Sequence, residues 1–232
     1  MARYTRAYSS FASRSAEVDL LRKLAARKER VDPIARRHEI NALCRGSLVL
    51  LCGHLEAFIK DLGEVALDSL HRKTVSREKL PVRFYYHISK GIVDEIRDTN
   101  DPDKVAKKVF ALLEDDLCFW AQSGPFPCPI PADRFNRGFG NPAHDAIKTY
   151  FARFGYSEYQ RDLDRQLKSR LPVVTNAVDH LVDVRNKIAH GDPNETKTPG
   201  EVGELTCLIR QYCIAADGVF ASWFGRTLCS IR

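Results

Sequence analysis

Apolar residues recur three and four positions apart along most of the chain, which is the period of an amphipathic helix. The longest such pattern runs from about residue 35 to residue 70. Its apolar face consists of Leu48, Leu51, Leu55, Phe58, Leu62 and Val65. A stripe of this length needs other helices to cover it, so we expect residues 35–70 to form a core helix.

Shorter helical patterns flank this segment. One spans Ser15–Val31 and ends before Pro33, which cannot continue a helix. The others lie downstream, at residues 84–97, 103–121, 143–154, 156–167, 171–190 and 199–224. Strand patterns are nearly absent, and no flexible polar linker divides the apolar segments. The sequence therefore predicts an all-α bundle of antiparallel long helices, one domain over residues 1–232, with residues 1–34 as a basic N-terminal helix and residues 35–70 and 170–224 as core helices.

The composition changes between Gln122 and Pro142, where five prolines and several glycines exclude a regular helix. We expect a loop insertion over residues 122–142. Basic and aromatic residues alternate within it, at Arg134, Phe135, Arg137 and Phe139. Aromatic rings stack on bases and arginines bind phosphates, so this segment would suit a single nucleic-acid strand; ordinary packing of the loop on the core is the alternative.

The helix expected over residues 171–190 contains a polar interruption of its apolar stripe. The residues at core-facing spacing are Leu171, Val174, Val178, Leu181, Arg185 and Ile188. A buried guanidinium is costly unless it is paired. Asn186 and His190 are four apart and share a helix face, and Gly191 ends the helix directly afterwards. Either this cluster is a functional site, or His190 satisfies the helix dipole while Arg185 reaches solvent.

The net charge of +6 is concentrated at the N-terminus. Residues 1–45 contain eleven Lys and Arg against five acidic residues, and the remaining residues carry 25 of each sign. Five of the cations cluster in the expected N-terminal helix: Arg22, Lys23, Arg27, Lys28 and Arg30. A basic face of this kind suits RNA, because phosphate contacts give affinity that does not depend on sequence. A solvated helix face is the alternative.

Composition and motifs argue against several other classes of protein. With 232 residues, 44% hydrophobic and 28% charged, the chain is typical of a soluble globular protein. No uninterrupted apolar run approaches the roughly 20 residues that span a bilayer, and residues 1–15 lack the apolar core of a signal peptide, so we expect a cytoplasmic protein without membrane contact. Seven cysteines without a C-x-x-C pair favour buried free thiols, and no ligand spacing indicates a metal. The absence of a Gly-rich phosphate loop argues against a kinase or nucleotide transferase.

Two segments together resemble a known family. The first is Arg185-Asn186-Lys-Ile-Ala-His190 followed by Gly191, and the second is LVLLCGHLEAFIKD, from Leu48 to Asp61. Both are similar to the HEPN superfamily, and in particular to stand-alone prokaryotic proteins of the RiboL-PSP-HEPN group. The resemblance covers residues 35–70 and 170–224 and implies a HEPN-like helical bundle.

The resemblance implies a metal-independent endoribonuclease without a cofactor, or a non-catalytic descendant that binds RNA or a protein. It also implies a homodimer in which two motif helices face each other. RNA cleavage by the 2′-hydroxyl needs a proton carrier and a cation for the phosphate, which His190 and Arg185 would supply. Asn186 would orient the imidazole or hold a phosphate oxygen. His54 and His180 match no motif position.

Glu56 completes the expected catalytic set, because an acidic residue on the equivalent helix of similar proteins faces the motif arginine. A surface pair between Glu56 and Lys60 is the alternative. Lys187 joins the five N-terminal cations as an expected RNA contact. The expected partners are RNA, a second copy of the chain and, if the protein is a toxin or antiviral defence effector, an antitoxin protein.

Overall fold

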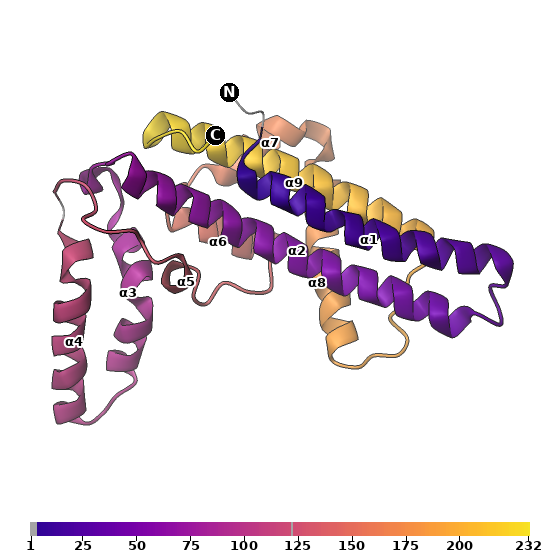
Figure 1. Ribbon diagram of the computed structural model, residues 1–232, viewed down its shortest axis with the longest axis horizontal. Helices are drawn as coiled ribbons and strands as arrows, with labels where there is room; N and C mark the ends of the chain where they lie inside the picture. Colours follow the sequence, from indigo (N-terminus) through magenta and orange to yellow (C-terminus); the bar gives the residue numbers. More distant parts are fainter. Residues whose placement is uncertain (1–3, 122) are drawn as a thin grey trace.

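The computed structural model describes residues 4–121 and 123–232, which fold into helices without a strand (Figure 1). In chain order the elements are α1 (Arg6–Val31), α2 (Arg37–Arg72), η1 (Arg77–Lys79), α3 (Val82–Arg97), α4 (Pro102–Trp120), α5 (Ala132–Phe135), α6 (His144–Ala152), α7 (Tyr159–Leu167), η2 (Lys168–Arg170), α8 (Leu171–Ala189) and α9 (Pro199–Thr227). The all-α fold expected from the helical period is confirmed.

The long helices α1, α2 and α9 lie side by side, and α8 packs against α2 and α9 (Figure 1). A turn of five residues, 32–36, joins α1 to α2, so these two helices are antiparallel. The predicted apolar stripe of α2 forms the centre of the core, where Leu55, Phe58 and Leu62 are fully buried. Phe11 of α1 covers Phe58, with ring centroids 5.6 Å apart.

The first helix is longer than its sequence pattern predicts. It begins at Arg6 rather than Ser15, because the Thr5 hydroxyl caps it by accepting a hydrogen bond from the backbone N–H of Tyr8 at 3.3 Å. Thr5 is itself tied to α9, where the buried carboxylate of Asp217 accepts from its backbone N–H at 3.3 Å. The polar residues between Tyr8 and Ser15 hide this first part of the helical pattern.

Helices α3 and α4 form a hairpin that leaves the bundle near the C-terminal end of α2 (Figure 1). Helix α4 starts as expected, with the Asp101 side chain accepting from the backbone N–H of Asp103 and of Lys104. The base of the hairpin is fixed by Arg77, whose Nη1 donates to the carbonyl of Cys118 at 2.5 Å. The hairpin is therefore anchored at its base and exposed along its outer side.

The described part of the loop insertion, residues 123–142, packs on the core. The rings of Phe135 and Phe139 are 0% and 6% exposed, and Phe135 lies 4.8 Å from Phe154 between ring centroids. Arg134 donates to both carboxylate oxygens of the buried Asp116, at 2.5 and 2.6 Å. Interpreting Phe135, Phe139 and Arg134 as a nucleic-acid clamp is therefore wrong. The two rings are buried in the core, and Arg134 pairs with a buried carboxylate. Gln122 lies outside the described residues.

Among the helices of the described residues, α2 alone is long and apolar enough to cross a membrane, by length and composition. The sequence expectation counted uninterrupted apolar runs, which charged residues such as Glu56 and Lys60 break. Half of the 18-residue window, whose mean hydropathy is 1.5, is buried inside the bundle. The core helix of a soluble protein has the same properties.

The seven cysteines are free thiols in the described structure, in part as expected. Cys44, Cys52 and Cys213 are buried. Cys118 and Cys207 are exposed, which corrects the expectation that the thiols are buried. Cys118 lies on α4 and Cys207 lies on α9, each on a helix face that is open to solvent.

Candidate functional site

The polar motif lies at the end of α8, which stops at Ala189, one residue before the predicted end at His190. Gly191 has φ +82°, the left-handed conformation that glycine adopts without strain. Its backbone N–H donates to the carbonyl of Ile188 at 3.1 Å, and that of Asp192 donates to the carbonyl of Lys187 at 3.0 Å. These two bonds form a Schellman motif, which fixes the position of His190 as the C-cap directly after the last helical residue, Ala189.

A long-range contact from α2 supports the loop that follows. Arg45 Nη1 donates to the carbonyls of Asp192 and Glu195, at 2.6 and 3.0 Å. The Glu195 carboxylate in turn pairs with Lys187 Nζ at 3.2 Å, so this expected RNA contact is already engaged within the chain. Sequence reasoning missed Arg45, because its partners are backbone carbonyls about 150 residues away and leave no local signal.

Arg185 occupies the inward stripe of α8, as expected, and is half-buried against α2. Its Nη2 donates to Oδ1 of Asn141 at 3.1 Å, so the guanidinium is held by the loop insertion. It also lies beside the buried thiol of Cys52. Burial raises the pKa of the Cys52 thiol, and the hydrogen bond and charge of Arg185 oppose that rise. Asn141 was not expected at the site, since sequence spacing does not place the loop.

Glu56 does not pair with Arg185 in the structure. Its carboxylate accepts from Lys60 Nζ at 2.6 Å, one helical turn away, which is the alternative that the sequence left open. The expected ion pair is corrected for a geometric reason: Lys60 is a neighbour of Glu56 on α2 itself. Glu56 and Arg185 nevertheless both act on Cys52. The charge of Glu56 contributes to the raised pKa of that thiol, and Arg185 opposes it.

His190 and Asn186 lie on a different side of α8 from Arg185, as their spacing requires. His190 is exposed, and no hydrogen bond or ion pair to its imidazole forms within residues 4–121 and 123–232. Asn186 is half-buried one turn earlier. The other two histidines considered as proton carriers are His54 and His180. His54 faces Glu17 at 3.7 Å, and burial is the main cause of its lowered pKa. His180 is exposed on the same helix as His190, away from the motif.

The five cations of α1 do not form one uniform cluster. Arg22 faces Asp19 at 3.9 Å, and Lys28 is paired with Glu39 at the start of α2. Lys23, Arg27 and Arg30 are exposed, and their spacing of four and three places them on one face of α1. The face available to an anion therefore consists of these three residues, and we refer to it as the α1 basic face.

The geometry brings an anchored cation and a free imidazole to the same helix end. Arg185 retains guanidinium N–H groups beyond the one bonded to Asn141, and guanidinium forks match phosphate oxygens. The imidazole of His190 faces solvent, where a substrate can reach it. Among the residues described, no three His, Cys, Asp or Glu side chains gather in a way that could hold a metal ion.

Comparison with known proteins assigns the chain to a family. No curated protein and no solved structure matches the chain. A family model, RiboL-PSP-HEPN, matches residues 13–222, which include most of α1 and α9, all of α2, and α8 with its polar motif. Membership supports a nuclease or another RNA-related function. The chain therefore belongs to the RiboL-PSP-HEPN family of the HEPN superfamily.

Proposed function

We propose that the protein is a metal-independent endoribonuclease and that the end of α8 is its active site. The observation that carries this proposal is the exposed, unbonded imidazole of His190 within two turns of Arg185, whose guanidinium is held in place by Asn141. An imidazole titrates near neutral pH, so it moves protons readily. A protein that only binds RNA has no need for it at this position.

The proposed reaction is an attack of a ribose 2′-hydroxyl on the adjacent phosphorus. The imidazole of His190 accepts the hydroxyl proton, the bond from phosphorus to the 5′-oxygen breaks, and that oxygen receives a proton. The products are a 2′,3′-cyclic phosphate and a free 5′-hydroxyl. Arg185 stabilises the negative charge that builds up on the phosphate oxygens, and Asn186 orients the imidazole or binds one of those oxygens.

A homodimer with facing motif helices would supply a second imidazole for the leaving oxygen. One chain offers one histidine at the motif, whereas acid and base are both needed in the same step. A two-fold axis beside α8 would place two copies of the motif in one groove. Light scattering at micromolar concentration should report a multiple of the 26.3 kDa chain, and a monomer alone would contradict this arrangement.

The central experiment incubates the purified protein with RNA in EDTA. Wild type should cleave, and the His190→Ala variant should be slower by roughly 10²- to 10⁴-fold, the usual contribution of a positioned acid or base. His180→Ala is the matched control, since it removes an exposed histidine from the same helix. Products should end in 2′,3′-cyclic phosphate, and a substrate with deoxyribose 5′ of the cut should resist.

The alternative is a non-catalytic module that holds RNA or a protein. Cleavage that disappears in EDTA, or that proceeds equally on DNA, would favour this alternative over the proposed mechanism. RNA binding without any cleavage would do the same.

We further propose that the nuclease acts on cytoplasmic RNA as a toxin or defence effector restrained by an antitoxin protein. Expression of wild type should then slow bacterial growth, while His190→Ala should not. Equal growth of the two strains would contradict this role without affecting the proposed chemistry.

A further inference from the structure

The outward face of α4 presents an apolar row that no described part of the chain covers. Phe110, Leu113 and Leu117 are 67%, 52% and 59% exposed. Together with the exposed Ala106 they are spaced by four, three and four residues, which is the heptad spacing of a helix seam. Exposed apolar rows of this regularity usually mark an interaction surface.

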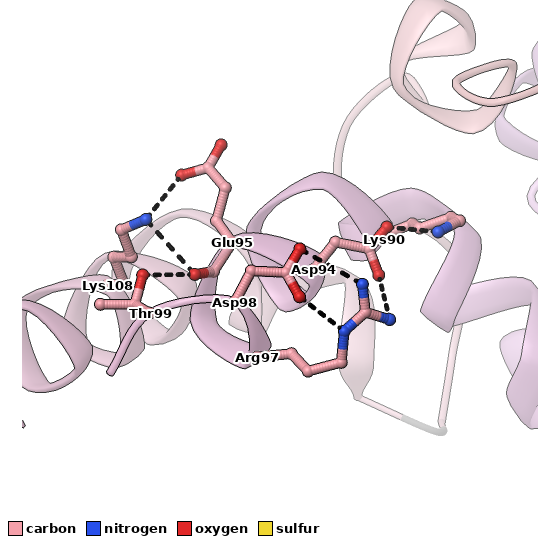
Figure 2. Close-up of polar contacts among 7 residues, drawn as sticks. All are labelled: Lys90, Asp94, Glu95, Arg97, Asp98, Thr99 and Lys108. Atoms are coloured by element: carbon pink, nitrogen blue, oxygen red, sulfur yellow. Dashed lines mark hydrogen bonds and ion pairs between the residues drawn. The ribbon is translucent and has the colours of Figure 1, made fainter. Parts of the chain in front are cut away.

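The opposite face of α4 is occupied by α3. Figure 2 shows Lys108 of α4 reaching Glu95 of α3, with Nζ 3.3 Å from the carboxylate and 3.4 Å from the backbone carbonyl. The same figure shows Arg97 of α3 between Asp94 and Asp98, at 3.2 and 2.9 Å. The Lys108 contact joins α4 to α3, whereas the Arg97 contacts stay within the end of α3. The residues of the apolar row lie on the other side of α4 from Lys108.

The base of the hairpin holds the row in a fixed orientation. Trp120 Nε1 donates to the Ser89 hydroxyl at 2.9 Å, and the buried Asp116 is bound by Arg134. The row is therefore presented on a pre-formed helix rather than on a flexible segment, which lowers the entropy cost of docking.

Two opposite charges flank the row on one side. Lys107 and Glu114 are both exposed, are seven residues apart on one face, and form no ion pair among the residues that the structure describes. If a second α4 lies antiparallel against the first, Phe110 meets Leu113 of the other copy and Ala106 meets Leu117. In that register Lys107 of each copy lies opposite Glu114 of the other.

We propose that the apolar row of α4 is a self-association surface that docks onto α4 of a second copy in antiparallel orientation. The argument is the self-complementarity of the row and its charges. One two-fold axis pairs Phe110 with Leu113 and Ala106 with Leu117 of the other copy, and it forms two reciprocal ion pairs. This interface is separate from the motif helices, so it does not depend on the proposed nuclease activity. Because the row consists of four residues on one helix, we expect weak association that requires a high protein concentration.

The first test compares two leucines with the same exposure. Leu117 of α4 and Leu20 of α1 are each 59% exposed, so replacing either by serine removes a similar apolar surface. In sedimentation experiments at 10 to 100 µM, a range on the order of the affinity of small interfaces, the weight-average mass of wild type should rise with concentration, and Leu117→Ser should remove most of this rise. Leu20→Ser should sediment like wild type. Equal masses for wild type and Leu117→Ser would overturn the proposal.

The second test uses charge reversal and does not depend on apolar packing. Lys107→Glu and Glu114→Lys should each weaken association, because like charges then face each other across the two-fold axis. The double variant restores both ion pairs with reversed sign, so it should regain most of the wild-type association. A double variant no better than the single ones would show that the antiparallel register is wrong. Circular dichroism confirms that each variant is folded.

Discussion

Arg185 of α8 donates a hydrogen bond from Nη2 to Oδ1 of Asn141, 3.1 Å away and 44 residues earlier in the chain. Asn141 has φ +55°, a conformation that asparagine tolerates better than most residues. The backbone of the loop insertion is thus shaped to present an amide to the motif arginine. The loop that looked unrelated to the motif supports the side chain that binds phosphate in the proposed mechanism.

Replacing Asn141 by glycine tests this support. Glycine keeps the positive φ but removes the amide, so Arg185 loses its partner and becomes less well positioned. We expect cleavage to fall roughly 2- to 10-fold, in line with a net hydrogen-bond contribution of about 0.5–1.5 kcal/mol. Asn141→Asp retains an acceptor and should retain activity. Unchanged cleavage by the glycine variant would mean that Asn141 does not position Arg185.

Gly191 should be needed for the shape of the α8 end. Its φ of +82° is strained for any residue with a Cβ atom, so Gly191→Ala should destabilise the protein by about 1–2 kcal/mol. Gly191→Asn should cost less, since asparagine visits this conformation more readily. Urea unfolding measures both variants. The open space around the Cβ position means that a large effect reflects backbone strain and not a clash.

Two glycines of α2 should respond oppositely to alanine. A Cβ atom on Gly63 would lie 1.8 Å from Oη of the buried Tyr150, whereas nothing lies within 4 Å of one on Gly53. Gly63→Ala should therefore destabilise the core by roughly 1–3 kcal/mol, the usual cost of overpacking. Gly53→Ala should stabilise the helix by up to about 1 kcal/mol. Thermal melts of the two variants that shift in the same direction would contradict the packing described here.

RNA affinity should depend on the α1 basic face. Replacing Lys23, Arg27 and Arg30 by glutamine should reduce the slope of log affinity against log salt by about 2, as expected for three phosphate contacts on a single strand. Replacing Arg22 and Lys28 is the control, because both already face acidic residues within the chain. Filter binding at several salt concentrations measures the slopes. An unchanged slope in the triple variant would place the RNA elsewhere.

His87 should make stability depend on pH. Burial, with a smaller contribution from the charge of Arg153, lowers the pKa of His87 from 6.5 to about 4. Between these pH values the unfolded chain binds a proton that the folded chain does not. The contribution of neutral His87 to the free energy of unfolding is therefore complete above about pH 6.5 and is lost as the pH falls toward 4. Urea midpoints across this range should vary less in His87→Gln, and identical pH profiles would exclude a contribution from His87.

The sequence alone determined the main helices, apart from the start of α1, and the approximate end of the motif helix, because these follow from local rules. The apolar period of α2 placed Leu55, Phe58 and Leu62 in the core, as the structure confirms. Gly191 ended α8 within one residue of the predicted position, since a left-handed residue closes a Schellman motif easily. The inward position of Arg185 also followed from spacing.

The tertiary structure alone decided which side chains meet. Helical periodicity could not show that Arg185 donates to Asn141 and lies beside Cys52. Nor could it show that Glu56 forms an ion pair with Lys60. It also could not show that Phe135 is buried, since this residue lies in a segment without helical period, or that Phe110 is exposed, since this residue lies in a segment with an apolar helical pattern. The physical reason is that periodicity defines a face, but the neighbour of that face depends on how distant segments pack together.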